Sequence, residues 1–270
     1  MKNNSSTSGK KFKVNFSTLV IPVAFLTALG VFHFIMGNPN NFQGGSPENA
    51  ALPGNYFGII YKGGFIVPVI MTLLLTVLTF VVERFIAIQK ANGKHAVSSF
   101  VQEVKMHLGN NDFEAALAAC DKQKGSVANV VRSVLKRYRT LEKEQGMTKD
   151  QKIASLQKEI EEATSLELPG LEQNLVILAT ITSLATLMGL LGTVLGMIRA
   201  FSALANAGAP DSVALAAGIS EALINTAFGI GTAALALIFY NVFTTRIDKI
   251  TYSIDEAGVS LVQSYGEKHA

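Results

Sequence analysis

The sequence alternates between long apolar blocks and segments that are rich in polar and charged residues. A helix needs about 20 mostly apolar residues to cross the hydrocarbon core of a bilayer, and four blocks approach or exceed that length. The pattern therefore predicts four transmembrane helices. The apolar blocks cover residues 16–36, 65–82, 173–198 and 213–245.

The first apolar block is preceded by lysines, as in a secretory signal peptide. Its apolar run is longer than the usual core of such a peptide, which has about 7–15 residues. The sequence that follows, "GNPNNFQGG", contains no small-x-small cleavage site. We therefore interpret this block as a helix that stays in the protein.

Lysine and arginine are distributed unevenly over the segments between the blocks. The N-terminal tail, residues 90–170 and the tail after residue 245 are basic, whereas residues 37–64 contain only Lys62 and residues 200–212 contain neither residue type. Because cytoplasmic segments carry the excess of Lys and Arg, both termini are expected in the cytoplasm.

The expected fold class is an all-α integral membrane protein, with long helices that extend into the cytoplasm. Its parts are a basic cytoplasmic tail (1–15), an N-terminal transmembrane helix (16–37), a periplasmic loop (38–64), a second transmembrane helix (65–89), a helical cytoplasmic domain (90–170), a third transmembrane helix (171–199), a short periplasmic loop (200–214), a fourth transmembrane helix (215–245) and a cytoplasmic tail (246–270).

The segment 90–170 reads as a set of helices because its apolar residues recur every three or four positions, as in "DFEAALAACDKQ" and "SVANVVRSVLKRYRTLEKE". "EQGMTKD" predicts a break, and "QKIASLQKEIEEATSLEL" restarts a helix. Pro169 and Gly170 are expected to mark its junction with the third span. The segment carries no catalytic motif, so extended helices are favoured over an enzyme.

Composition supports the assignment to the membrane. Of the 270 residues, 49% are hydrophobic and 16% are charged, against about 25% charged in an average soluble domain. The net charge of +3 is too small to indicate a nucleic-acid binder. The single cysteine, Cys120, excludes an internal disulfide and a cysteine metal cluster. No metal site or cofactor is expected.

Small and weakly polar residues follow one face of each of the last two spans. Close packing is the simplest explanation, since small residues let helix backbones approach and Gly192 to Gly196 is a GxxxG motif. Gly189, Gly192, Gly196 and Gly229 are therefore predicted packing residues. The two faces comprise Thr182, Thr186, Gly189, Thr193, Gly196 and Ala200, and Gly218, Glu221, Asn225, Gly229, Thr232 and Ala236, with Ala222, Thr226 and Ala233 beside the second.

Packing does not explain Glu221, because an ionisable residue inside a span is costly and usually faces a cavity or the bundle interior. Thr193 and Glu221 each lie 14 residues from Ala207. In two antiparallel helices they are expected at the same depth, with Thr226 about 7 Å deeper. Thr193, Glu221, Asn225 and Thr226 are therefore predicted to line one polar patch that fits an ion path.

The last two spans resemble the MotA/TolQ/ExbB family of proton-channel proteins, and the ExbB/TolQ branch more than the flagellar MotA branch. The resemblance is carried by "GLLGTVLGMIRAF" (189–201) and "GISEALINTAFGIGTAALALIFYNVF" (218–243), and "VVERFI" (81–86) is similar to the end of the family's first shared helix. The chain departs from the family where Ala185-Thr186 replaces an Ala-Pro pair, and in having the extra first span.

The resemblance implies a homopentamer in the bacterial inner membrane, around a pore that holds single-span helices of an ExbD/TolR-like partner. An aspartate of that partner would exchange protons. Thr193 and Thr226 would line the proton route, and Glu221 matches the family's intramembrane glutamate. The protein would be a channel or motor and not an enzyme, and would energise outer-membrane transport through a TonB-like protein.

Other interpretations stay open at this point. A TolQ-like role in envelope maintenance or another ion-driven stator fits the same residues, and sodium could replace the proton. A secondary carrier is less favoured because no internal repeat or broken helix pair is visible. An intramembrane hydrolase would need Ser220 and His33 in contact, and nothing in the sequence brings them together. A passive scaffold would use the small residues for packing alone.

Overall fold

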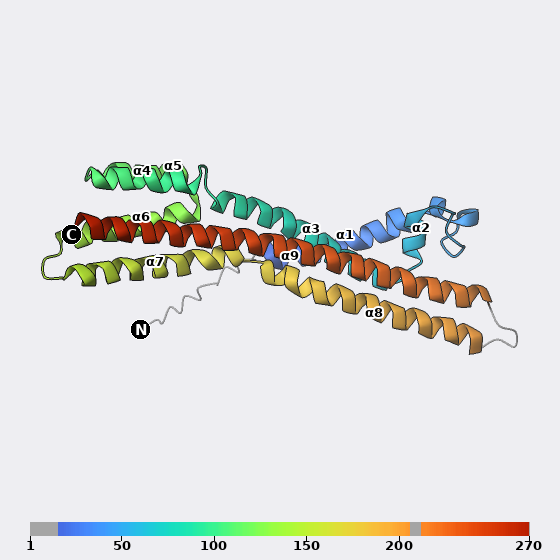
Figure 1. The fold of residues 1–270 in the computed structure, drawn as a ribbon. Coiled ribbons are helices and arrows are strands. Elements are labelled where there is room, and N and C mark those ends of the chain that lie inside the picture. The colour runs from blue at the N-terminus through green and yellow to red at the C-terminus, as the bar shows by residue number, and fades with distance from the viewer. Residues whose placement is uncertain (1–15, 206–211, 270) are drawn as a thin grey trace, which may run out of the picture. The chain divides into compact units, whose positions relative to one another are not determined.

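The computed structural model describes residues 16–205 and 212–269, and helices are the regular structure throughout those ranges (Figure 1). Besides helices, these ranges hold an isolated antiparallel bridge between Phe42 and Ala51. The all-α fold class is therefore confirmed. The longer helices are α1 (Phe16–Gly30), α3 (Ile66–Ala91), α4 (Val97–Gly109), α5 (Phe113–Gln123), α6 (Gly125–Lys143), α7 (Lys149–Glu172), α8 (Leu175–Ala205) and α9 (Ser212–Lys268).

Four of the described helices are long and apolar enough to cross a membrane, as the sequence pattern predicts. Their mean hydropathies lie between 1.9 and 2.4 over the most apolar window. The first combines α1 with the π-helical turn η1 (Val31–Met36). The four segments are Thr18–Met36, Ile66–Ala91, Leu175–Ala205 and Ser212–Lys268.

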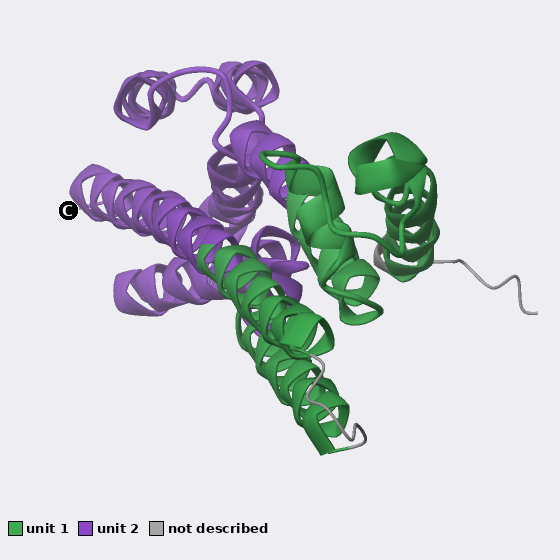
Figure 2. Ribbon diagram, turned by 90° about the vertical axis from the view of Figure 1, so that its right-hand side faces the viewer, with its two compact units in different colours: residues 1–79, 181–234 green, residues 80–180, 235–270 purple. Residues whose placement is uncertain are grey.

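The chain divides into two compact units, which Figure 2 colours separately. Unit 1 comprises residues 1–79 and 181–234, and unit 2 comprises residues 80–180 and 235–270. The helices α3, α8 and α9 contribute residues to both units.

In unit 1, the N-terminal helix packs on α3 through a small apolar core. Ala28, Phe32 and Met36 lie against Val67 and Met71. The segment between the two helices is folded over this core by η2 (Pro39–Asn41), η3 (Gln43–Gly45) and α2 (Tyr56–Tyr61). The ring of Tyr61, at the end of α2, stacks on Phe32 with centroids 4.6 Å apart.

Side-chain amides and one ammonium group hold this segment in place. Asn41 donates from Nδ2 to the backbone oxygens of Ile35 and Met36, at 2.7 and 2.9 Å. Lys62 donates from Nζ to the backbone oxygens of Pro47 and Glu48. Burial lowers the pKa of the Lys62 ammonium group, and the charge of Glu48 partly opposes that effect.

In unit 2, the amphipathic faces of α4 to α7 pack together. The helix α6 buries Val127, Val131 and Val134 on one side, which is the three- and four-residue period of its sequence. The turn before α7 ends in a capping box, in which Gln151 N donates to the Thr148 hydroxyl and Thr148 N donates to Gln151 Oε1. The predicted break at "EQGMTKD" accordingly separates α6 from α7.

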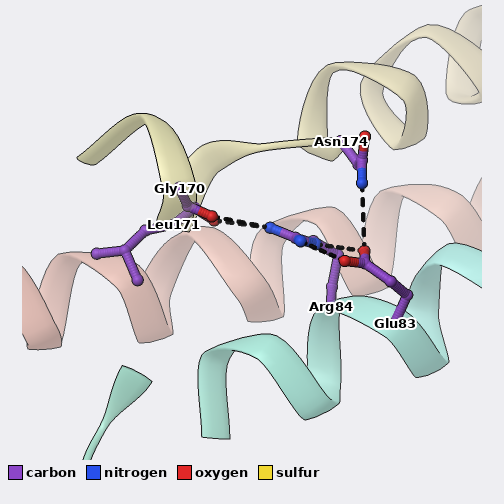
Figure 3. Close-up of polar contacts among 5 residues, drawn as sticks. All are labelled: Glu83, Arg84, Gly170, Leu171 and Asn174. Carbon is purple, nitrogen blue, oxygen red and sulfur yellow. Dashed lines mark hydrogen bonds and ion pairs between the residues drawn. The ribbon is translucent and has the colours of Figure 1, made fainter. Parts of the chain in front are cut away.

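The break before the third span differs from the expected position at Pro169-Gly170. The helix α7 continues through Pro169 to Glu172, and the chain turns at Asn174, whose φ is 66°. Asparagine tolerates this left-handed conformation better than most residues. The Arg84 guanidinium accounts for the shift, because it donates to the backbone oxygens of Gly170 and Leu171 at 3.3 and 3.2 Å at the end of α7 (Figure 3).

Candidate functional site

Glycines bring α8 and α9 into close contact within unit 1. A Cβ atom on Gly192 would lie 2.4 Å from the Cβ of Asn225, and one on Gly196 would lie 2.7 Å from the Ala222 nitrogen. On α9, a Cβ atom on Gly229 would lie 2.6 Å from the Ala185 oxygen, and Gly189 faces this same glycine. The four predicted packing glycines therefore all lie at this helix contact, where a larger side chain does not fit.

Thr193 and Thr226 meet across this contact, and their hydroxyl groups are hydrogen-bonded to each other. Thr193 also contacts the Gly189 backbone oxygen at 3.2 Å, and Thr226 contacts that of Ala222 at 3.1 Å. A shallow surface hollow on α8 reaches Thr193. Paired hydroxyls can donate and accept hydrogen bonds, so they can bind water or pass a proton.

Asn225 lies at the same contact but is fully buried. Its Nδ2 donates to the backbone oxygen of Gly63 at 2.8 Å, in the turn before α3. Its Oδ1 accepts no hydrogen bond in the described part of the chain. Asn225 was expected to line a pore surface. In the single chain it does not lie at a surface, because the turn at Gly63 covers its side chain.

Glu221 is buried with its charge compensated. Its Oε1 lies 2.5 Å from Nη1 of Arg199 on α8. Gly64, with φ of +74°, lies against both groups, because a Cβ atom there would stand 2.6 Å from the same oxygen and 3.3 Å from Nη1 of Arg199. The carboxylate is therefore paired with an arginine and packed against a glycine turn, and this arrangement explains how a charged residue is accommodated in an apolar stretch.

The predicted single polar patch is divided into two sites. Thr193 lies opposite Thr226, whereas Glu221 lies opposite Arg199. The expectation that Thr193 and Glu221 share one depth was wrong by about one helical turn. Counting symmetrically from Ala207 assumes a pairing register that the close glycine contacts do not follow.

Arg199 was expected only as the end of the third span, and its pairing with Glu221 was not predicted. The helix α8 continues to Ala205, and the small and apolar residues after Arg199 were the available signal. An arginine need not end a helix when an acidic side chain on the neighbouring helix neutralises it. Gly63 and Gly64 were also missed, because nothing local indicates that they contact α9.

A cavity of 810 Å³ opens beside the Arg199–Glu221 pair in unit 1. Its polar side chains are Glu48, Lys62, Arg199, Ser212, Ser220 and Glu221, and small residues such as Ala203 and Ala217 form most of the rest. The described residues contain no group of three or more His, Cys, Asp or Glu side chains that could hold a metal ion.

Residues 123–256 match the sequence model of the MotA/TolQ/ExbB proton channel family. About half of the chain therefore carries the sequence of this family. It is a membrane protein of all-α fold, as the four apolar helices indicate.

Individual members of the MotA/TolQ/ExbB family share part of the sequence. An ExbB-like biopolymer transport protein of Synechocystis sp. is 42% identical over 86 residues, which is 31% of this chain and 41% of the relative. The Tol-Pal system protein TolQ of Pseudomonas aeruginosa is 34% identical over 124 residues, 46% of this chain and 54% of the relative. The biopolymer transport protein ExbB of Salmonella typhimurium is 38% identical over 89 residues, 32% of this chain and 36% of the relative. The chain thus spans about half or less of the length of these relatives.

Proposed function

We propose that this chain is an ExbB-like subunit of a proton channel in the bacterial inner membrane, which uses the proton-motive force to energise TonB-dependent transport at the outer membrane. In this proposal it forms a homopentamer around single-span helices of an ExbD/TolR-like partner and passes work to a TonB-like protein. Both termini lie in the cytoplasm, and α8 and α9 form the wall of the pore. The family match over residues 123–256 and the ExbB-named relatives support the proposal.

The hydroxyl contact between Thr193 and Thr226 is the observation that carries the proposal. It joins the two helices on which the family resemblance is strongest. Hydroxyl groups can relay a proton because each donates one hydrogen bond and accepts others. In the pentamer, the pair would face the aspartate of the partner helix, and that aspartate would exchange protons with water held at the hydroxyls.

The test measures proton flux in liposomes that contain the chain together with its single-span partner. A potassium gradient with valinomycin sets the potential, and pyranine inside the liposomes reports pH. Thr193→Val and Thr226→Val keep the side-chain shape and remove the hydroxyl. We expect each to lower the flux by at least about tenfold, since a positioned proton-transfer group typically contributes about a hundredfold or more to a rate.

Thr232→Val is the matched control. Thr232 lies on the same helix and is buried, but its hydroxyl donates to the Phe228 backbone oxygen of its own helix at 2.9 Å. This variant should keep the flux of the natural chain. Natural flux in both Thr193→Val and Thr226→Val would reject the proposed route and leave a packing role for these residues.

A TolQ-like function is the second candidate, because the TolQ of Pseudomonas aeruginosa matches over 46% of this chain. Complementation separates the two roles. In a host that lacks its own ExbB and TolQ, rescue of energised siderophore uptake supports the first role. Rescue of detergent resistance without uptake supports the second.

A further inference from the structure

The cavity beside Arg199 and Glu221 ends at this ion pair. On α9, its lining runs from Ser212 to Glu221. The next residues toward Thr226 on that face are Ala222 and Asn225, and both are buried. Glu221 is therefore the last cavity-lining side chain before the buried polar contact between α8 and α9.

Polar groups continue beyond Glu221 in the direction of the threonine pair. Asn225 lies one helical turn away, and its buried Oδ1 accepts no hydrogen bond in the described residues. Thr226 follows directly and contacts Thr193. A buried acceptor without a donor is costly. Along α9, Asn225 lies between Glu221 and Thr226, and a water or a hydrated proton that reached its Oδ1 would satisfy this acceptor.

Arg199 holds Glu221 at this boundary. Its guanidinium contacts Oε1 at 2.5 Å, and the side chain of Arg199 is 57% exposed while that of Glu221 is 10% exposed. Gly64 packs against the same carboxylate oxygen and against Nη1 of Arg199. Arg199 lines the cavity beside Glu221, and an arginine beside an ion route is an electrostatic barrier to protons and other cations.

We propose that Arg199 is a positioning residue for Glu221 and that the Arg199–Glu221 pair is a closed gate between the cavity and the Asn225–Thr226–Thr193 route. The gate opens when the two side chains separate, which frees the carboxylate and moves the positive charge aside. The other charged side chains that line the cavity are Glu48 and Lys62, and Lys62 is held by the backbone oxygens of Pro47 and Glu48. This inference rests on the proposed proton route.

The experiment measures passive proton leak through the complete complex with its partner, at a fixed potential and without any TonB-like protein. Arg199→Gln removes the barrier charge. We expect the leak to rise about fivefold, a modest factor because Arg199 is half exposed and such pairs are weak. Arg199→Lys keeps a positive charge and should leak as little as the natural chain.

Two further variants distinguish a gate from a general loss of structure. The charge swap Arg199→Glu with Glu221→Arg restores an ion pair in the reverse order and should bring the leak back toward the natural value. Lys62→Gln removes a positive charge from the same cavity without touching Glu221, and should leave the leak unchanged. Equal leaks in Lys62→Gln and Arg199→Gln would overturn the gate, as would a natural leak in Arg199→Gln.

Failure of the gate and failure of the route give different results. If the leak of Arg199→Gln disappears on adding Thr226→Val, the ions pass the threonine pair and both proposals stand. If the natural complex carries a flux that Thr226→Val stops, while Arg199→Gln behaves like the natural chain, only the gate fails. If neither the natural complex nor Arg199→Gln conducts, the proposed function itself is rejected.

Discussion

Gly229 and Gly231 are two residues apart in α9 but have opposite surroundings. A Cβ atom on Gly229 would meet the Ala185 oxygen at 2.6 Å and the Gly189 Cα at 2.8 Å, whereas one on Gly231 would meet nothing within 4 Å. Backbone atoms cannot move aside as a flexible side chain can. At the scale of single residues, a glycine is therefore required at some positions of α9, whereas other positions have room for a side chain.

This contrast gives a prediction for stability. Gly229→Ala should destabilise the detergent-solubilised protein by about 1–3 kcal/mol, the usual cost of overpacking. Gly231→Ala is the control and should be neutral or stabilising by up to about 1 kcal/mol, because alanine favours helix. Thermal unfolding followed by circular dichroism compares the two variants, and equal melting temperatures would contradict the close contact.

Cys120 provides a second prediction at this scale. The residue is buried, and burial raises the pKa of its thiol to about 11. At pH 8 the reactive thiolate is about a hundredfold scarcer than for a thiol at the ordinary value, since two pKa units separate them. Maleimide should therefore label the native protein slowly and the denatured protein fast. Rapid native labelling would show that unit 2 opens at this position.

The raised pKa of the Cys120 thiol also predicts how the stability of the folded protein changes with pH. Because the folded state disfavours the thiolate, the contribution of Cys120 to stability is full below its ordinary pKa of 9.0 and declines as pH rises above that value. Cys120→Ala removes this titration. The melting temperature of the natural protein should therefore fall relative to that of the variant between pH 8 and pH 10.

At the scale of elements, the buried side chain of Arg84 stabilises the junction between α7 and α8. Arg84 is 2% exposed and is paired with Glu83. Asn174 lies in the turn and donates from Nδ2 to Glu83 at 3.4 Å (Figure 3). The pair thus satisfies the last backbone oxygens of one helix and contacts the turn that starts the next, within unit 2.

Arg84→Ala should therefore destabilise the protein by about 2–4 kcal/mol, because Glu83 and the α7 oxygens lose their partner. Arg132→Ala is the matched control in the same unit. Arg132 pairs with Asp121 at an exposed site, and its loss should cost less than about 1 kcal/mol. Urea unfolding measures both, and similar midpoints would show that the junction does not depend on Arg84.

At the scale of the whole molecule, oligomerisation determines whether a pore exists. Many large apolar side chains of α8 are exposed in the single chain, among them Leu187, Leu190, Val194, Ile198 and Phe201. Such a surface needs lipid or protein to cover it. We expect the detergent-purified chain to be a pentamer in native mass spectrometry and to take up a few copies of its single-span partner. A monomer or dimer that binds no partner would remove the central pore and favour a carrier.

The N-terminal helix gives another prediction at this scale, because α1 and η1 cover Val67 and Met71 of α3. We propose that this extra helix packs on the outside of the pentamer. A chain that lacks residues 1–40 should then still form pentamers but melt at a lower temperature, since its removal exposes apolar side chains of α3. Loss of the pentamer on this truncation would reject the outer position.

Local information was sufficient to predict most of the helices of this protein, but not all of their ends. Length and hydropathy predicted the four apolar helices, because a helix that faces lipid must be apolar over its whole span. The spacing of the small residues on α8 and α9 also predicted a packing face, and the structure places Gly189, Gly192, Gly196 and Gly229 at one contact. The end of α7 could not be predicted from its spacing, because it is held by Arg84, which is distant in the sequence.

The sequence by itself determined where the apolar helices lie, apart from the ends of α7 and α8, and which faces carry small or polar groups, because these properties depend on neighbours within a few turns. Only the tertiary structure decided which polar groups meet. The pairing of Thr193 with Thr226, of Glu221 with Arg199 and of Asn225 with Gly63 depends on how two helices and a distant turn interlock. A shift of one helical turn would leave every local preference unchanged and would separate all three pairs.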